Sequence, residues 1–111
     1  QERGAFVMAV DLIRAMTLAA DLDTILRAGI PSRYEDPAGY EMGYAQLTRT
    51  IANIDPKGRL QSDWQGASLR ACGIRATCTY GIQGVVGNWI AAVERHAGQP
   101  LGRDPATNIG E

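Results

Sequence analysis

The sequence predicts an all-α protein, a compact bundle of four or five short helices that ends in a flexible C-terminal tail. Apolar residues recur at steps of three and four along most of the chain, which is the spacing of an amphipathic helix. Glycine and proline stand where such helices would start or stop. The 111 residues, of which 45% are hydrophobic, suffice for one domain with a core. We therefore expect a single helical domain over residues 1–98 and a flexible tail over residues 99–111.

The first predicted helical region covers residues 5–28 and carries two apolar stripes. Their centres lie about half a turn apart around a helix axis. A single straight helix would need partners on both sides, so we favour two helices with a break near residues 17–21. Asp21 would then be the N-cap of the second helix, which Gly29 and Pro31 would end.

The next predicted helix begins at Asp36 and Pro37, which suit the N-cap and the first helical position. Its apolar residues from Tyr40 to Ile54 follow a heptad-like spacing, so one face should meet the core. Residues 55–58 then have the composition of a tight turn.

A fourth helix is predicted from Ser62, because Ser62 and Gln65 have the spacing of a capping box. The segment after it has two interpretations. From Ile74 to Ile82 apolar and polar residues alternate, as in a strand, but the chain shows no second convincing strand as a partner. We therefore favour an extended connector that leads into a last helix capped by Thr77 or Thr79.

The last predicted helix carries glycines at every third position on the side of its apolar stripe. Each glycine costs a helix about 1 kcal/mol relative to alanine, so the repeat predicts a face that packs closely against another backbone. That backbone would belong to the core of this chain or to a second copy of it, which makes a homodimer one prediction. The residues predicted to pack this helix are Gly81, Gly84, Gly87 and Trp89.

Charge and composition narrow the class of protein. The formal net charge is −1, which argues against the global basic field of a nonspecific DNA binder. No apolar run approaches the roughly 20 residues of a membrane span, and no signal peptide is evident. Two cysteines are too few for a disulfide framework, so we expect reduced thiols and a cytoplasmic location. The excess of arginine over lysine, together with much alanine, suggests a bacterial or phage source.

No motif predicts catalysis, a metal or a cofactor. His96, the single histidine, has no nucleophile or orienting acid in a recognisable motif. Cys72 and Cys78 match no zinc-ligand spacing. The glycine repeat lacks the lysine and hydroxyl residue that end a phosphate-binding loop. We therefore expect a protein that is not an enzyme and that binds neither a metal nor a cofactor.

An acidic, tyrosine-rich segment is the predicted partner-binding surface. Tyrosine offers a large contact area at little entropic cost and is enriched in binding hot spots. The ordinary alternative is that the tyrosines belong to the core and that the acids suit the positive end of a helix dipole. The favoured function is a small protein-interaction module that binds a larger macromolecular complex, as an assembly chaperone or an inhibitor does. The predicted contact residues are Tyr34, Glu35, Asp36, Tyr40 and Glu41.

The alternative function is nucleic-acid binding by the fourth predicted helix. Arginine and polar side chains together are what a recognition helix offers to phosphates and base edges. The second half of the chain also carries more bases than acids. A glycine inside this helix, Gly66, and a long preceding loop weaken the interpretation. The residues predicted for this function are Arg59, Gln65, Arg70 and Arg75.

Overall fold

The computed structural model describes residues 11–79 and 81–98, and their fold is α+β, not all-α. Three helices and a three-stranded antiparallel sheet make up this part of the chain. The predicted bundle of four or five helices is therefore wrong. The predicted tail, residues 99–111, lies outside the described residues. In chain order the elements are α2 (Leu12–Ala28), α3 (Pro37–Ile54), β1 (Arg59–Asp63), β2 (Gly66–Ala71), β3 (Ile74–Cys78) and α4 (Ile82–Ala97).

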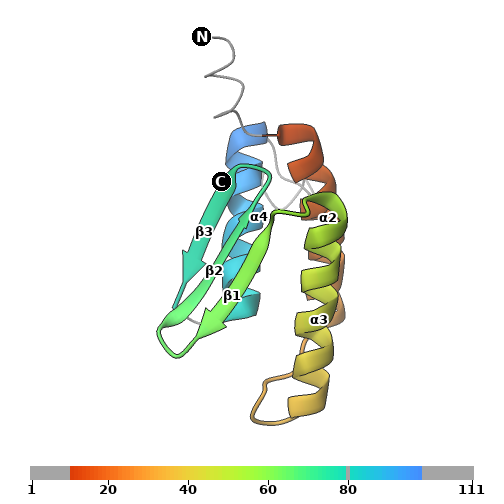
Figure 1. Cartoon of the computed structure of the whole chain (residues 1–111), viewed down its shortest axis with the longest axis vertical. Coiled ribbons are helices and arrows are strands. Elements are labelled where there is room, and N and C mark those ends of the chain that lie inside the picture. The colour runs from red at the N-terminus through yellow and green to blue at the C-terminus, as the bar shows by residue number, and fades with distance from the viewer. Residues whose placement is uncertain (1–10, 80, 99–111) are drawn as a thin grey trace, which may run out of the picture.

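The described helices all lie on one face of the sheet. α4 packs across that face, mainly on β3 and β2, and α2 lies beside α4 (Figure 1). α3 packs on α2 and reaches the edge strand β1. The strands lie in chain order, β1-β2-β3. On the other face no described element covers the strands (Figure 1), and along β1 exposed residues alternate with less exposed ones.

The region predicted as a fourth helix forms the β1–β2 hairpin instead. The side chain of Asp63 accepts hydrogen bonds from the backbone N–H groups of Gln65 (2.9 Å) and Gly66 (3.2 Å). Such local side-chain bonds favour turns over helices. Gly66 has a φ of +147°, a conformation that residues with a side chain rarely adopt. The capping box predicted for Ser62 is therefore wrong, because Ser62 lies in β1 and Gln65 lies in the turn that leads to β2.

The strand interpretation of residues 74–78 is confirmed, and the extended connector is wrong. β3 pairs antiparallel with β2, so its partner strand lies inside the segment that was expected to be a helix. Cys72 and Gly73 join the two strands and have φ angles of 55° and 82°. A two-residue loop with two positive φ angles is the type I′ turn that matches the twist of antiparallel strands.

α2 is one continuous helix across the predicted break at residues 17–21. Its N-cap is Asp11 and not Asp21; the Asp11 carboxylate accepts a hydrogen bond of 3.3 Å from the backbone N–H of Arg14. The physical reason is that α2 has neighbours on two sides, α4 and α3. The stripe from Leu18 to Ile25 is buried between them, whereas Ile13 of the first stripe is 79% exposed.

The predicted start of α3 is confirmed, and the predicted start of α4 is wrong. α3 begins as predicted, with Asp36 as the N-cap and Pro37 as the first residue. The carboxylate of Asp36 accepts a hydrogen bond of 3.0 Å from a backbone N–H in the first turn. α4 begins after Gly81, which offers no side chain for a capping bond. The predicted caps Thr77 and Thr79 are therefore wrong.

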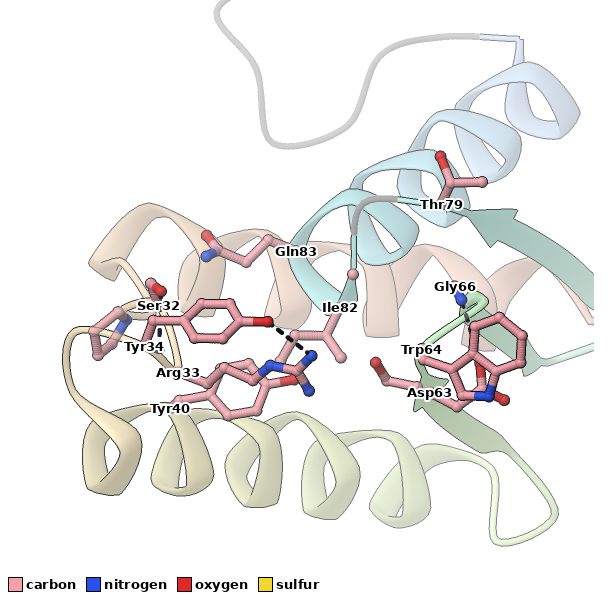
Figure 2. Close-up of a pocket in the computed structure, with 13 residues that line it drawn as sticks. Ser32, Arg33, Tyr34, Tyr40, Asp63, Trp64, Gly66, Thr79, Ile82 and Gln83 are labelled. Atoms are coloured by element: carbon pink, nitrogen blue, oxygen red, sulfur yellow. Dashed lines mark hydrogen bonds between the residues drawn. The ribbon is translucent and has the colours of Figure 1, made fainter.

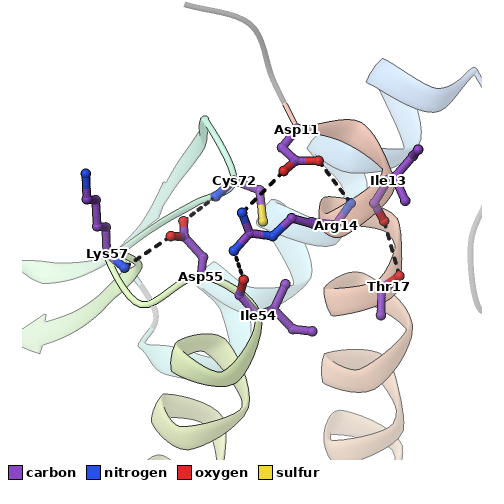
Figure 3. A network of polar contacts seen from close by, with 8 residues as sticks. All are labelled: Asp11, Ile13, Arg14, Thr17, Ile54, Asp55, Lys57 and Cys72. Carbon is purple, nitrogen blue, oxygen red and sulfur yellow. Dashed lines mark hydrogen bonds and ion pairs between the residues drawn. The ribbon is translucent and has the colours of Figure 1, made fainter. Parts of the chain in front are cut away.

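A polar network joins three elements at one end of the molecule (Figure 3). The carboxylate of Asp55, just after α3, accepts hydrogen bonds from the backbone N–H groups of Cys72 (2.8 Å) and Lys57 (3.1 Å). The guanidinium of Arg14 in α2 donates to the carbonyl oxygen of Ile54. The end of α3 is thereby tied to α2 and to the β2–β3 turn, which fixes how the helical pair meets the sheet.

One apolar core lies between the sheet and the helices. The predicted burial of Trp89 is confirmed, because none of its surface is exposed. Every element except β3 and the edge strand β1 contributes a large side chain that is buried almost completely. These are Leu18, Leu22, Leu47, Ile51, Leu69, Val85, Val86, Trp89 and Val93.

Candidate functional site

Three separate stretches of the sequence surround one open hollow of about 350 Å³, here called the aromatic groove. They are the loop before α3 together with the start of α3, the tip of the β1–β2 hairpin, and the start of α4 (Figure 2). The groove therefore exists only when the helical pair and the sheet are assembled. The groove is lined in part by the side chains of Ser32, Arg33, Tyr34, Tyr40, Asp63 and Trp64.

The groove carries two of the most exposed large side chains among the described residues. Tyr34 is 83% exposed and Trp64 is 87% exposed. Tyr40 is half-buried and packs edge-on against Tyr44, with ring centroids 6.2 Å apart. The hydroxyl of Tyr44 donates to the carbonyl oxygen of Leu60 at 3.3 Å. Tyr40 is thus held by packing, whereas Tyr34 and Trp64 are presented to solvent.

The loop before α3 holds its exposed tyrosine in place through short-range contacts. The hydroxyl of Ser32 accepts a hydrogen bond of 3.0 Å from the backbone N–H of Tyr34. The guanidinium of Arg33 donates to the Tyr34 hydroxyl at 3.3 Å and lies 5.2 Å from the centre of its ring (Figure 2). The hydrogen bond to Tyr34 raises the pKa of Arg33. Arg33 therefore stays charged beside the aromatic ring.

Two of the predicted partner-binding residues, Tyr34 and Tyr40, line the aromatic groove. Glu35, Asp36 and Glu41 are exposed beside it without lining it. The carboxylate of Asp36 is occupied as the N-cap of α3. The acidic residues therefore form a rim next to the groove and not its wall.

Trp64 and Asp63 belong to the groove but were not among the predicted contact residues. The expected fourth helix placed them on a different element from the tyrosines. The signal that could have found them is the run from Asp63 to Gly66, which is the composition of a hairpin tip. A hairpin there leaves its tryptophan exposed and gives it no place in the core.

Three of the four residues predicted for nucleic-acid binding lie side by side on the strands of the sheet. Arg59 is opposite Arg70, and Arg70 is opposite Arg75, in the register of the sheet. All three are exposed; we call them the arginine row. Gln65 lies at the hairpin tip, away from the row. The predicted recognition helix is therefore wrong, but the sheet brings its arginines together.

The arginine row has no carboxylate partner among the described residues. Within residues 11–79 and 81–98 the ion pairs join Arg14 to Asp11 and Arg27 to Asp23, both within α2 or at its start. Arg59 donates to the backbone carbonyl of Gly58 at 2.8 Å. The positive charge of the row is therefore not neutralised inside this part of the chain.

The three glycines predicted to pack the last helix lie in different environments. Gly81 precedes α4 with a φ of +112°, and Gly84 lies half-buried within the helix. A Cβ atom at Gly87 would meet no atom within 4 Å, so no described neighbour occupies the space that its missing side chain leaves. Close packing on Gly84 and a homodimer that covers Gly87 stay predictions.

The cysteines and the histidine do not form a reactive centre in the described part of the chain. Burial, reinforced by the negative charge of Asp55, raises the pKa of the Cys72 thiol to about 11. That thiol is therefore protonated at neutral pH and is a poor nucleophile. His96 is exposed in the last turn of α4. No group of three or more metal-ligating side chains occurs among residues 11–79 and 81–98.

Comparisons with family models, with curated proteins and with solved structures found no match to this chain. None of the helices described by the structure combines the length and the apolar character that crossing a membrane requires. The aromatic groove and the arginine row are therefore the two surfaces that bear on the function of this protein.

Proposed function

We propose that this protein is a small interaction module that holds a segment of a larger protein complex in its aromatic groove. The observation that carries the proposal is the convergence of Tyr34 and Trp64 on one hollow. Both side chains are more than four-fifths exposed, at 83% and 87%. Tryptophan and tyrosine dominate binding hot spots, where truncation typically costs about 2 kcal/mol or more. An exposed aromatic pair is therefore best explained by a partner that covers it.

The charges around the groove define the partner segment that would fit. Asp63 lines the groove, as does the charged Arg33. Three further carboxylates are exposed next to lining residues in the sequence: Glu35, Asp36 and Glu41. Acidic groups therefore outnumber the one guanidinium around the groove. Complementary charge speeds encounter and selects the partner. The segment would therefore place an apolar side chain between Tyr34 and Trp64 and carry lysine or arginine next to it.

A role as an assembly chaperone or an inhibitor in a bacterium or phage suits a small binding module of this composition. The cytoplasmic location belongs to the same proposal. It is supported by the cysteine content, because two cysteines are too few for a disulfide framework. Recovery of the protein from the periplasmic fraction of the native host would contradict that location.

The test is a quantitative pull-down from the native host lysate with the full chain and three variants. Trp64→Ala and Tyr34→Ala should each lower recovery of one stoichiometric partner at least about tenfold, because a loss of about 1.4 kcal/mol is tenfold in affinity. Met42→Ala is the matched control, since Met42 is also exposed (73%) and does not line the groove. It should leave recovery unchanged.

The circular dichroism spectra of the variants should match that of the parent chain, since all three side chains are exposed. Equal recovery of the partner with all variants would place its binding surface elsewhere. The absence of any stoichiometric partner would contradict the proposed class of function.

A further inference from the structure

We propose that the open face of the sheet is a second binding surface, which docks in the major groove of a DNA duplex through the arginine row. This inference goes beyond the proposed function. It concerns the opposite side of the sheet from α4 and a different class of partner. The two surfaces meet at Asp63, which lines the aromatic groove and also a hollow beside Gln61 and Ser68 on the open face.

The first argument is electrostatic. In an antiparallel sheet, like charges directly opposite each other destabilise the pairing. Arg70 has an arginine on each side, Arg59 and Arg75, and no described carboxylate reaches the row. A phosphate backbone would offset this repulsion and would accept hydrogen bonds from guanidinium groups.

The row continues around the edge of the sheet. Arg95 of α4 lines a shallow hollow of about 260 Å³ together with Arg75 and Thr77 of β3. Four arginines can therefore follow one strand of a nucleic acid. The formal net charge of −1 does not oppose this, because the Debye length is only about 8–10 Å at physiological salt and the local charge decides.

The next register row supplies groups that can read bases. Gln61 is opposite Ser68, and Ser68 is opposite Thr77. This row lies two residues further along each strand, about 7 Å from the arginines. Glutamine pairs with adenine in the major groove, and serine and threonine bond to any base edge. In protein–DNA complexes, phosphate contacts position the protein and base contacts select the sequence. The arginine row would make the phosphate contacts, and this polar row would make the base contacts.

The dimensions of the face agree with a major groove. Neighbouring strands lie about 4.8 Å apart, so the axes of the two outer strands are about 10 Å apart. The major groove of B-DNA is about 12 Å wide and admits a two-stranded ribbon, so two neighbouring strands of this face can enter it. No described element covers this face (Figure 1).

The same face does not suit single strands. Proteins that bind single-stranded nucleic acid stack its bases on aromatic side chains. The outward positions of the three strands carry no aromatic residue, and Trp64 at the hairpin tip lines the aromatic groove instead. A duplex, which presents phosphates and closed base pairs, is therefore the occupant that this surface fits.

The experiment is fluorescence anisotropy of a labelled duplex of about 20 base pairs titrated with the full chain, at salt concentrations between about 50 and 200 mM. Arg70→Ala and Arg75→Ala should each weaken binding and reduce the slope of log affinity against log salt by about one. Arg70→Lys should keep most of that slope, because lysine retains the charge. Arg49→Ala, which removes an exposed arginine of α3, should change neither quantity.

Competition experiments distinguish duplex DNA from other possible ligands. The single strand of the same sequence and poly-glutamate should compete at least about tenfold more weakly than the duplex. Equal competition by either would overturn the assignment to duplex DNA, as would no duplex binding at the lowest salt. Unchanged salt slopes in the Arg70 and Arg75 variants would overturn the role of the arginine row. Trp64→Ala should leave DNA binding unchanged, so failure here is distinguishable from failure of the groove proposal.

Discussion

The indole N–H of Trp89 donates a hydrogen bond of 3.0 Å to the carbonyl oxygen of Ile74. This bond joins the middle of α4 to the first residue of β3, and the Trp89 side chain is completely buried. It satisfies a backbone acceptor that water cannot reach. Trp89 therefore fills the core and also fixes how the helix lies on the sheet.

Replacing Trp89 by phenylalanine should lower the free energy of unfolding by about 1–3 kcal/mol. The ring keeps part of the packing, but the Ile74 carbonyl loses its buried donor. Urea titration followed by circular dichroism measures the change. Trp64→Phe is the control and should shift stability by less than about 0.5 kcal/mol, because Trp64 is exposed. An equal effect of the two substitutions would contradict the role of the indole bond.

Alanine should act in opposite directions at two glycines. Gly66→Ala should destabilise by more than about 1 kcal/mol, because Gly66 has a φ of +147° and an added Cβ would lie 2.7 Å from the Cys78 carbonyl oxygen. Gly87→Ala should stabilise by up to about 1 kcal/mol, since alanine is the better helix former and the space is open.

Thermal unfolding of both glycine variants at several protein concentrations provides the measurement. If a homodimer covers Gly87, the alanine would instead lower the melting temperature, and that temperature would depend on concentration. A melting temperature independent of concentration would argue against the predicted dimer.

Stability should decline at alkaline pH because of one thiol. The pKa of Cys72 is raised from 9.0 to about 11, mainly by burial. The unfolded chain therefore loses this proton at a lower pH than the folded chain. The free energy of unfolding should be unaffected by this group below about pH 9 and should fall between about pH 9 and 11, by up to roughly 2 kcal/mol. Urea titrations across this range should show a smaller decline for Cys72→Ala; parallel curves would refute the assignment.

Reversing charge on the rim of the aromatic groove should slow partner association. Glu35→Lys with Glu41→Lys changes two exposed carboxylates, and we expect the association rate to fall several-fold at low salt and less at high salt. Asp36 is left intact because it caps α3. Surface plasmon resonance with the captured partner gives the rate. Asp21→Lys on α2 is the charge-matched control for each of the two single substitutions, which should each slow association in part. A rate that rises would mean that the partner is acidic.

The sequence predicted α3 well because its signals are local. Asp36 and Pro37 act within one turn, and the stripe from Tyr40 to Ile54 needs only one partner face. The sheet was missed because alternation of alanine with arginine and serine also fits a helix, in which alanine is the best former. The pairing between β2 and β3 makes these residues strands. That pairing cannot be seen in the pattern of either segment alone.

The residues of the two candidate surfaces were also predicted from local composition, whereas their arrangement in space was not. Tyr34 and Tyr40 were recognised as contact residues from composition, and both line the groove. Trp64 was not, because only the hairpin carries it to them. The arginines were predicted as a group. Their alignment depends on the cross-strand register, which the two hairpin turns set. The expected fourth helix ran through the first of these turns and ended at the second.

The order of strands along the chain has a consequence for the kinetics of folding. Each strand pairs with its neighbour in sequence, and α4 follows directly. Such contacts form quickly, because closing a short loop costs little entropy. α2 packs on α3, its neighbour in the sequence, but it must also dock on α4, the last described helix of the chain order. We therefore expect docking of α2 to be the last step of folding, so that Leu18→Ala accelerates unfolding far more than it retards refolding in stopped-flow experiments.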